Sequence, residues 1–303
     1  MMRYLTCRGP KRAVIVTTAA FLATIVVFGL YAARPAQAAI ETLVGAGDIA
    51  SCNYNRDQAT ASLLDSIPGT VFTAGDNAYP SGTFNQFQNC YGPTWGRHYA
   101  RTLPSVGNHE YRTSGASGYF RYFGAAANPS GKGYYSYNLG DWHIVVLNSM
   151  CQKIGGCSAS SPQAQWLRGD LVANPRLCTL AYWHHPVFTS GEHGNDPRMR
   201  PAFQILYDNN AELVINGHDH DYERFAPQTP SGTADPARGI REIVVGTGGA
   251  KLRPFATIRP NSEVRDANTW GVIKLTLNPD SYGWQFVPVA GQTFTDSGTT
   301  SCH

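Results

Sequence analysis

The sequence has 303 residues, of which 42% are hydrophobic and only 15% are charged, and its formal net charge is +3. This length and apolar content are sufficient for one large core, and no linker rich in Pro, Gly or Ser divides the chain, so we expect one compact domain. A content of 31 glycines and 12% aromatic residues with so few charges is typical of a loop-rich extracellular protein and unusual for a cytosolic enzyme.

Residues 1–38 have the pattern of a secretory signal peptide. Four cationic side chains precede an uncharged stretch over residues 13–33, and Ala36-Gln37-Ala38 provides a cleavage site of the A-x-A kind. The alternative is an uncleaved anchor, because the uncharged stretch is nearly long enough to span a bilayer. Cleavage would remove five Lys and Arg residues and no acidic residue, which changes the formal net charge from +3 to −2. We therefore predict a secreted domain over residues 39–303 that has no stable membrane insertion and binds no nucleic acid.

Six cysteines follow residue 38, and an even number of cysteines in an exported chain indicates disulfide bonds. None of them has the C-x-x-C spacing that is typical of a zinc site. Six cysteines allow fifteen pairings. Among these we favour Cys52 with Cys90, Cys151 with Cys157, and Cys178 with Cys302.

The first half of the predicted domain alternates apolar runs of strand length with a stretch of helical periodicity. We predict strands over residues 41–46, 70–74 and 103–106, and a helix over residues 57–67 that Asp57 caps. Residues 80–137 are rich in glycine and aromatic side chains. These aromatic residues either line a cleft or form the core of a loop-rich insertion, and we favour the core for Tyr91, Trp95, Tyr99, Tyr111, Tyr119 and Phe120.

The second half continues the alternation and then changes to paired strands. We predict helices over residues 162–172 and 197–209, and strands over residues 142–147, 179–183, 213–215, 241–245, 271–277 and 282–289. The turn sequence Asn278-Pro279-Asp280-Ser281 joins the last two strands as a hairpin. Together these elements predict an α/β (α+β) fold, a four-layer αββα sandwich of two mixed β-sheets flanked by helices.

Polar residues follow five of the predicted strands. They are Asp48, Asp76 with Tyr79, Asn108 with His109, His184 with His185, and His218 with His220. Each motif alone is an ordinary turn, because Gly-Asp and Gly-Asn are common turn formers. Ligands of α/β sheets, however, collect at the carboxyl ends of strands, and all five ends carry residue types that bind metals. We therefore predict a shared metal site at these carboxyl ends.

The chemical types of the candidate ligands restrict which metal ions the site can bind. Carboxylate, amide oxygen, phenolate and imidazole without thiolate suit Fe, Mn or Zn and do not suit Cu(I). The chain offers seven candidate ligands. One metal ion that keeps a coordination position open for a substrate binds fewer protein ligands than this. Two ions that share one bridging carboxylate satisfy this set, which predicts a dinuclear centre.

The ordered motifs Gly47-Asp48, Gly75-Asp76 with Tyr79, Gly107-Asn108-His109-Glu110, His184-His185-Pro186 and Gly217-His218-Asp219-His220 resemble those of the calcineurin-like metallophosphoesterases. Within that superfamily the chain resembles the purple acid phosphatases. Ala50 stands where the wider superfamily usually has histidine, and Tyr79 is supplied three residues after Asp76 instead. The resemblance implies Fe(III) beside Tyr79 and a divalent Fe, Zn or Mn ion at the second position.

The resemblance also assigns roles to individual residues. It implies a first metal held by Asp48, Asp76, Tyr79 and His220, and a second held by Asp76, Asn108, His184 and His218. His109 and His193 correspond to the outer histidines of the family and are our candidate catalytic residues. The chain departs from the family pattern at Ala50 and Ala181, and neither position supplies a ligand. His185 either faces the substrate or packs structurally, and we favour the structural role.

These observations predict a secreted phosphomonoesterase that acts on small phosphate esters. Two metals about 3.5 to 4 Å apart lower the pKa of a bound water and hold the oxygens of an in-line displacement, so we predict direct attack of a metal-activated hydroxide on phosphorus. His109, helped by His193, would stabilise the equatorial oxygens and protonate the leaving alkoxide. The alternatives are a phosphodiesterase or nucleotidase with the same site, and a non-catalytic extracellular binding protein that needs metal for its structure.

Overall fold

The computed structural model describes residue 9 and residues 40–127 and 130–303. The chain divides into two units, Met1–Gln37 and Ala38–His303, and the fold described here is that of the second unit. The predicted signal peptide lies outside the described residues. Within the described ranges, no helix combines the length and the apolar composition that crossing a bilayer requires.

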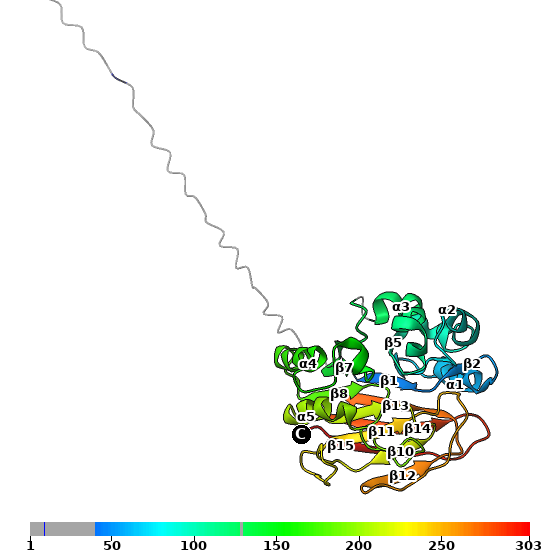
Figure 1. Ribbon diagram of the computed structural model, residues 1–303. Helices are drawn as coiled ribbons and strands as arrows, with labels where there is room; N and C mark the ends of the chain where they lie inside the picture. The colour runs from blue at the N-terminus through cyan, green and yellow to red at the C-terminus, as the bar shows by residue number, and fades with distance from the viewer. Residues whose placement is uncertain (1–8, 10–39, 128–129) are drawn as a thin grey trace, which may run out of the picture. The chain divides into compact units, whose positions relative to one another are not determined.

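Two large mixed sheets dominate the described residues (Figure 1). The six-stranded sheet has the order β15 (Ser297–Ser301), β14 (Ser281–Pro288), β13 (Gly271–Asn278), β1 (Glu41–Ala46), β3 (Thr70–Ala74) and β5 (Thr102–Ser105). The seven-stranded sheet has the order β12 (Ser262–Asp266), β10 (Tyr222–Phe225), β11 (Arg241–Val245), β9 (Leu213–Asn216), β8 (Cys178–Tyr182), β7 (Trp142–Val146) and β6 (Tyr135–Leu139). A short parallel pair joins β2 (Ala50–Ser51) to β4 (Ala78–Tyr79). This architecture confirms the predicted sandwich of two mixed sheets.

The helices are α1 (Arg56–Ser66), α2 (Phe84–Gln86), α3 (Ser117–Phe123), α4 (Pro162–Ala173) and α5 (Arg200–Asp208). Shorter helical turns cover Phe87–Tyr91, Trp95–Arg101, Glu110–Arg112, Ser114–Ala116, Gly124–Ala127, Cys151–Ile154 and Pro197–Met199. The predicted cap of α1 is wrong: Asn55 precedes this helix without a side-chain cap, and Asp57 lies in its first turn. The Asp57 carboxylate instead accepts a hydrogen bond from Thr94 Oγ1 at 2.7 Å, and this contact with a distant segment leaves it unable to cap.

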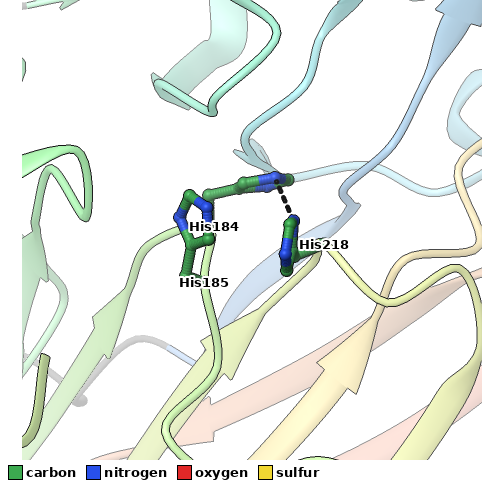
Figure 2. A group of neighbouring side chains, drawn as sticks. All are labelled: His184, His185 and His218. Carbon is green, nitrogen blue, oxygen red and sulfur yellow. Dashed lines mark hydrogen bonds between the residues drawn. The ribbon is translucent and has the colours of Figure 1, made fainter. Parts of the chain in front are cut away.

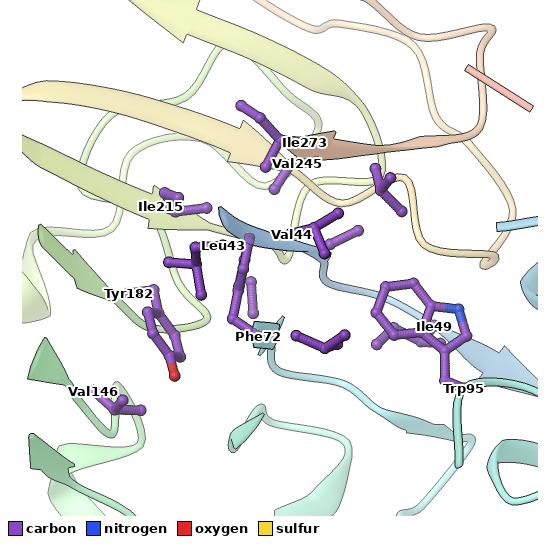
Figure 3. Packing of buried hydrophobic residues seen from close by; sticks show 14 of the residues in the cluster. Leu43, Val44, Ile49, Phe72, Trp95, Val146, Tyr182, Ile215, Val245 and Ile273 are labelled. Atoms are coloured by element: carbon purple, nitrogen blue, oxygen red, sulfur yellow. The ribbon is translucent and has the colours of Figure 1, made fainter. Parts of the chain in front are cut away.

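The core between the two sheets consists of apolar side chains that alternate along the strands. Leu43 of β1 and Phe72 of β3 lie on the same face and point toward Tyr182 and Ile215 of the other sheet (Figure 3). The rings of Phe72 and Tyr182 lie 5.3 Å apart, centre to centre. This layer fixes the two sheets against each other, and therefore also the strand ends that carry the polar motifs.

A second core layer lies on the outer face of the seven-stranded sheet. Val145, Ala181 and Val214 of three neighbouring strands pack there with buried side chains of α4 and α5. Ser161 caps α4 by accepting a hydrogen bond from the backbone N–H of Ala164 at 3.3 Å, and Pro162 occupies the first helical position as predicted.

The aromatic segment after β4 contributes to the core. Tyr91, Trp95 and Tyr119 are fully buried, in agreement with the core alternative, whereas Tyr99 is 42% exposed. The three predicted disulfide pairs, Cys52–Cys90, Cys151–Cys157 and Cys178–Cys302, are present. The first of these pairs ties this segment to the loop after β2.

Candidate metal centre

The polar motifs meet at the carboxyl ends of strands from both sheets. Asp48, Asp76 and Asn108 follow β1, β3 and β5, which are parallel neighbours in the six-stranded sheet. His184 and His218 follow β8 and β9, which are parallel neighbours in the other sheet. The structure therefore brings these side chains together along one edge of the sandwich, between the two sheets.

Three of these residues have an unusual backbone conformation. The φ angles of Asp48, Asp76 and His218 are 59°, 49° and 75°, which is the left-handed region that residues other than glycine rarely adopt. Such conformations cost on the order of 1–3 kcal/mol each and cluster at functional sites. Position 107 also requires glycine, because a Cβ there would lie 2.1 Å from Oδ1 of Asp76. The surrounding structure thus holds these side chains in conformations that local propensity alone would not select.

Four of the predicted ligands form a first cluster around the phenol of Tyr79. The Tyr79 hydroxyl lies 2.7 Å from Asp48 Oδ1, 3.3 Å from Asp76 Oδ2 and 3.1 Å from His220 Nε2. His220 Nε2 also lies 3.2 Å from Asp48 Oδ1. Asp48, Asp76 and His220 are all buried.

A second cluster surrounds the imidazole of His184. Its Nε2 lies 3.0 Å from Asn108 Oδ1, 3.2 Å from Asp76 Oδ2 and 3.3 Å from His218 Nδ1. Figure 2 shows the contact between His184 and His218 as a dashed line. Asp76 Oδ2 belongs to both clusters, and this atom is therefore in the position that a bridging carboxylate would need.

The residues present fit a dinuclear metal site. Backbone carbonyl oxygens accept hydrogen bonds from Nδ1 of two imidazoles, His184 to Ala74 O at 2.8 Å and His220 to Lys251 O at 2.7 Å. This arrangement leaves Nε2 of each neutral ring without a proton and directed at the carboxylates, which is the usual arrangement of histidines that bind metals. The donor set of carboxylate, phenol, amide and imidazole is suited to Fe, Mn or Zn.

The charged side chains of the two clusters shift one another's pKa values. Burial opposes ionisation of Asp76, but His184 and His109 hold its pKa below the ordinary value. Burial opposes protonation of His184 as well, but Asp76 and Asp48 raise its pKa to about 9. Burial and the nearby His184 and His193 lower the pKa of His218 to about 3. Burial also opposes protonation of His220, but Asp48 raises its pKa. Protons on these histidines therefore balance part of the negative charge, and bound cations would replace them.

His185 is close to the second cluster but is held by another element. Its Nδ1 lies 2.7 Å from Ser149 Oγ, and its ring lies 4.2 Å from that of His218, centre to centre (Figure 2). His184, His185 and His218 also bring one nitrogen each within 4.8 Å of one another. The structural role that we favoured fits the Ser149 contact, while the proximity to His218 places this ring at the edge of the site.

The two candidate catalytic histidines lie on opposite sides of the clusters. The ring of His109 lies 4.3 Å from that of Tyr79, centre to centre and tilted by 56°, and its Nε2 lies 3.8 Å from Asp76 Oδ2. The ring of His193 lies 4.2 Å from that of His218. Both side chains are partly exposed, 17% for His109 and 35% for His193, so both are accessible to a molecule that binds at the site.

Glu110 is an important residue whose role the sequence did not reveal. Its buried carboxylate accepts hydrogen bonds from the backbone N–H groups of Asp76, Asn77, Ala78 and Gly107 at 2.7 to 3.3 Å. It thereby joins the loops after β3 and β5, which carry three predicted ligands. The glutamate is part of the quoted Gly-Asn-His-Glu motif, but nothing in the motif indicates what it contacts.

Asp219 is a second residue that the sequence analysis missed. Its Oδ1 accepts hydrogen bonds from Nδ1 and the backbone N–H of His193 at 2.7 and 3.1 Å, and its Oδ2 accepts one from Thr189 Oγ1 at 2.6 Å. Asp219 stands between His218 and His220 in the bend that follows β9, and its side chain contacts the loop that carries His193. In the sequence, only the position of Asp219 between two histidines could have indicated that it belongs to the site.

Comparisons with known proteins agree with this geometry. The family model of the calcineurin-like phosphoesterases matches residues 42–222. Purple acid phosphatase 15 of Arabidopsis thaliana is 28% identical over 240 residues, which is 67% of this chain and 44% of that protein. Purple acid phosphatase 22 of the same plant is 33% identical over 122 residues, 38% of this chain and 27% of that protein. The chain thus spans less than half the length of these curated relatives.

Solved structures show the same fold at low sequence identity. Purple acid phosphatase PPD1 from yellow lupin seeds superposes with a TM-score of 0.67 at 20% identity, covering 88% of this chain and 55% of that one. GAP50, described as the anchor in the inner membrane complex of Plasmodium, has a TM-score of 0.67 at 12% identity, covering 87% of this chain and 89% of that one. One fold thus serves proteins with different descriptions, so an activity must be argued from the side chains of the site.

Proposed function

Because this chain belongs to the calcineurin-like phosphoesterase family, we propose that it hydrolyses small phosphate monoesters at a dinuclear metal centre. One observation carries the proposal: Asp76 Oδ2 lies 3.3 Å from the Tyr79 hydroxyl and 3.2 Å from His184 Nε2, so one carboxylate oxygen touches both ligand clusters. Metals held by these two clusters would supply the Lewis acidity that activates water and offsets the charge of phosphoryl oxygens.

The proposed ligand assignment follows the two clusters. Asp48, Asp76, Tyr79 and His220 would hold the first metal, with Fe(III) as the ion that a tyrosinate favours. Asn108, His184 and His218 would hold a divalent Fe, Zn or Mn ion together with Asp76. The backbone carbonyls of Ala74 and Lys251 keep His184 and His220 in the tautomer that this assignment requires.

The outer histidines would act on the substrate itself. The Pro80 carbonyl accepts a hydrogen bond from His109 Nδ1 at 2.7 Å, which leaves His109 Nε2 directed toward the carboxylates and toward a bound phosphoryl group. Asp219 holds His193 in the same way from the other side. A histidine that also carries a proton on Nε2, as an imidazolium, would donate a hydrogen bond to phosphoryl oxygens and could give that proton to the departing alkoxide, and such assistance is typically worth about 100- to 10,000-fold in rate. We assign both roles to His109 with help from His193.

The proposed setting is extracellular. The three disulfide bonds are typical of proteins from oxidising compartments. The predicted signal peptide over residues 1–38 would export the chain and leave residues 39–303 as the working domain. Its substrates would be small phosphate esters, without a nucleic-acid partner.

Hydrolysis assays of residues 39–303 test this proposal. We expect turnover of a simple aryl phosphate monoester that stops when a chelator removes the metals and returns when they are restored. The matching aryl diester, measured at the same pH, should be cleaved more slowly. Faster cleavage of the diester would indicate a phosphodiesterase, and absence of turnover in protein that carries two metals would contradict the proposal.

A further inference from the structure

A pocket of about 570 Å³ lies beside the segment that holds His220. The pocket is lined by Leu252, Arg253, Pro254, Phe255, Arg265, Asp266, Ala267 and Asn268. Its walls thus combine two guanidinium groups, one carboxylate and several apolar side chains. None of the proposed catalytic roles uses these residues.

Hydrogen bonds connect one wall of the pocket to His220 of the proposed metal centre. Lys251 O accepts the hydrogen bond from His220 Nδ1 at 2.7 Å, and the backbone N–H of Arg253 donates to His220 O at 3.0 Å. Leu252, between these two residues, belongs to the pocket wall. Since neighbouring Cα atoms are about 3.8 Å apart, the wall begins within roughly 10 Å of the His220 imidazole. A substrate that contacts both places would have to span about this distance.

The two arginines are available to an anion. Arg253 Nη1 lies 3.1 Å from Glu192 Oε2, but this pair is exposed, 41% for the arginine and 54% for the glutamate, so it contributes little and exchanges readily. Arg265 Nη1 donates to Ser262 O and Oγ at 2.9 and 2.8 Å. Among the described residues, no carboxylate oxygen lies within 4.0 Å of the Arg265 guanidinium, and its Nε and Nη2 make no hydrogen bond.

Asp266 reduces the positive charge of the pocket but does not cancel it. Its Oδ1 accepts a hydrogen bond from the backbone N–H of Asn268 at 3.0 Å, which keeps this oxygen engaged within its own turn. Among the lining residues themselves two guanidinium groups stand against one carboxylate, and the second carboxylate, Glu192, contacts Arg253 from outside the lining in an exposed pair that an anion can displace. Arginine forks match phosphate oxygens in geometry and charge, and a partly enclosed setting strengthens such contacts.

We infer that this pocket binds a second phosphate group on the leaving group of the substrate. The preferred substrate class is then a small bisphosphate ester in which one phosphate reacts at the metal centre and the other contacts Arg253 and Arg265. The apolar side chains of Leu252, Pro254 and Phe255 would pack against the carbon skeleton between the two phosphates. This inference deepens the proposed function and rests on it.

Paired substrates of graded length test the inference. Linear alkanediols of three to six carbons are prepared as monophosphates and as bisphosphates, and kcat/KM is measured for each pair. We expect the protein to prefer the bisphosphate by about tenfold at the best spacing, beyond the twofold that two equivalent reactive groups provide. Arg265→Met and Arg253→Met should each remove most of this preference while leaving kcat for the monophosphates unchanged. The control Arg168→Met, which replaces an exposed arginine of α4, should change nothing.

A binding measurement separates the pocket from the catalytic proposal. The non-hydrolysable bisphosphonates and monophosphonates of the same lengths are titrated into metal-loaded protein by calorimetry. Tighter binding of the bisphosphonates that Arg265→Met abolishes would support the pocket even if no ester is hydrolysed. Equal binding of both kinds of ligand, or a preference that persists in both arginine variants, would overturn the inference whether or not the protein is a phosphatase.

Discussion

The hydroxyl of Tyr79 donates a hydrogen bond to Oδ1 of Asp48 over 2.7 Å. Asp48 follows β1 of the six-stranded sheet, whereas Tyr79 lies in the short strand β4. Burial together with the charges of Asp48 and Asp76 raises the pKa of Tyr79 well above its ordinary value. The phenol therefore stays protonated while no cation is bound. A bound trivalent ion would reverse this preference, because its charge favours the phenolate.

Replacing Tyr79 with phenylalanine should remove the visible absorption of iron-loaded protein. A phenolate bound to Fe(III) absorbs visible light by charge transfer, and phenylalanine provides no oxygen for this bond. The measurement is the visible spectrum at known iron content, with Tyr54→Phe as the control, since Tyr54 is an exposed residue that packs on Trp270. A visible band that survives in Tyr79→Phe at full iron content would show that another ligand is responsible.

Replacing Asp219 with asparagine should impair catalysis without loss of metal. The amide cannot provide the charged acceptor that orients His193, so turnover should fall by about tenfold to 100-fold. Metal content and thermal midpoint should remain close to those of the parent, because Asp219 contacts His193 and Thr189 and none of the seven proposed ligands. Asp235→Asn, which alters a half-buried carboxylate that accepts from Tyr207 far from the site, is the matched control. Loss of metal in Asp219→Asn would assign Asp219 to the metal centre instead.

Replacing Glu110 with alanine should destabilise the fold strongly. Four backbone N–H groups donate to this buried carboxylate, and each buried donor left without a partner costs about 1–3 kcal/mol. We expect the free energy of unfolding to fall by about 3 kcal/mol or more in denaturant titrations. Asp208→Ala at the exposed end of α5 should change it by less than about 0.5 kcal/mol. A similar small change in both variants would mean that water replaces the carboxylate of Glu110.

The buried carboxyl group of Glu242 should make the free energy of unfolding depend on pH. Burial raises its pKa from 4.5 to about 8, although the backbone N–H groups of Val187 and Phe188 donate to its two oxygens at 2.8 and 3.0 Å. The folded protein therefore retains a proton that the unfolded chain releases above pH 4.5. By proton linkage, the stability that Glu242 contributes is complete below pH 4.5 and is lost as the pH rises through 8.

The variant Glu242→Gln isolates this effect, because the other groups titrate alike in both proteins. The parent should exceed the variant in free energy of unfolding by more at pH 5 than at pH 8.5, as measured by urea titration at both values. An equal difference at the two pH values would show that Glu242 keeps an ordinary pKa in the folded protein.

Much of the sheet structure was predictable because its central strands are continuous apolar runs. The predicted bounds of the strands at residues 41–46 and 70–74 match β1 and β3. The strands β12 and β15 were not predicted, since Ser262–Asp266 and Ser297–Ser301 have no apolar run. Both lie at sheet edges and depend on pairing with distant strands, which a local pattern cannot reveal.

The candidate site was predictable to the extent that its residues directly follow strands. Parallel strands bring their carboxyl ends to one edge, so the chain order of Asp48, Asp76 and Asn108 was enough to group them. Glu110 and Asp219 act instead on backbone groups and side chains far along the chain, and their partners became visible only in the folded structure. The pocket around Arg253 and Arg265 likewise joins a loop to the end of β12, and the two segments have no common motif.

The central claim is that Asp76 bridges two metal ions, and metal analysis of Asp76→Asn tests it most directly. The parent and the variant are purified, dialysed and analysed for metal per chain, with Asp65→Asn on the exposed face of α1 as the control. The parent and the control should retain two ions per chain and hydrolyse an aryl phosphate. Asp76→Asn should lose both ions and its turnover together, because one carboxylate oxygen serves both positions. Two tightly bound ions in Asp76→Asn would contradict the bridging role and the site built around it.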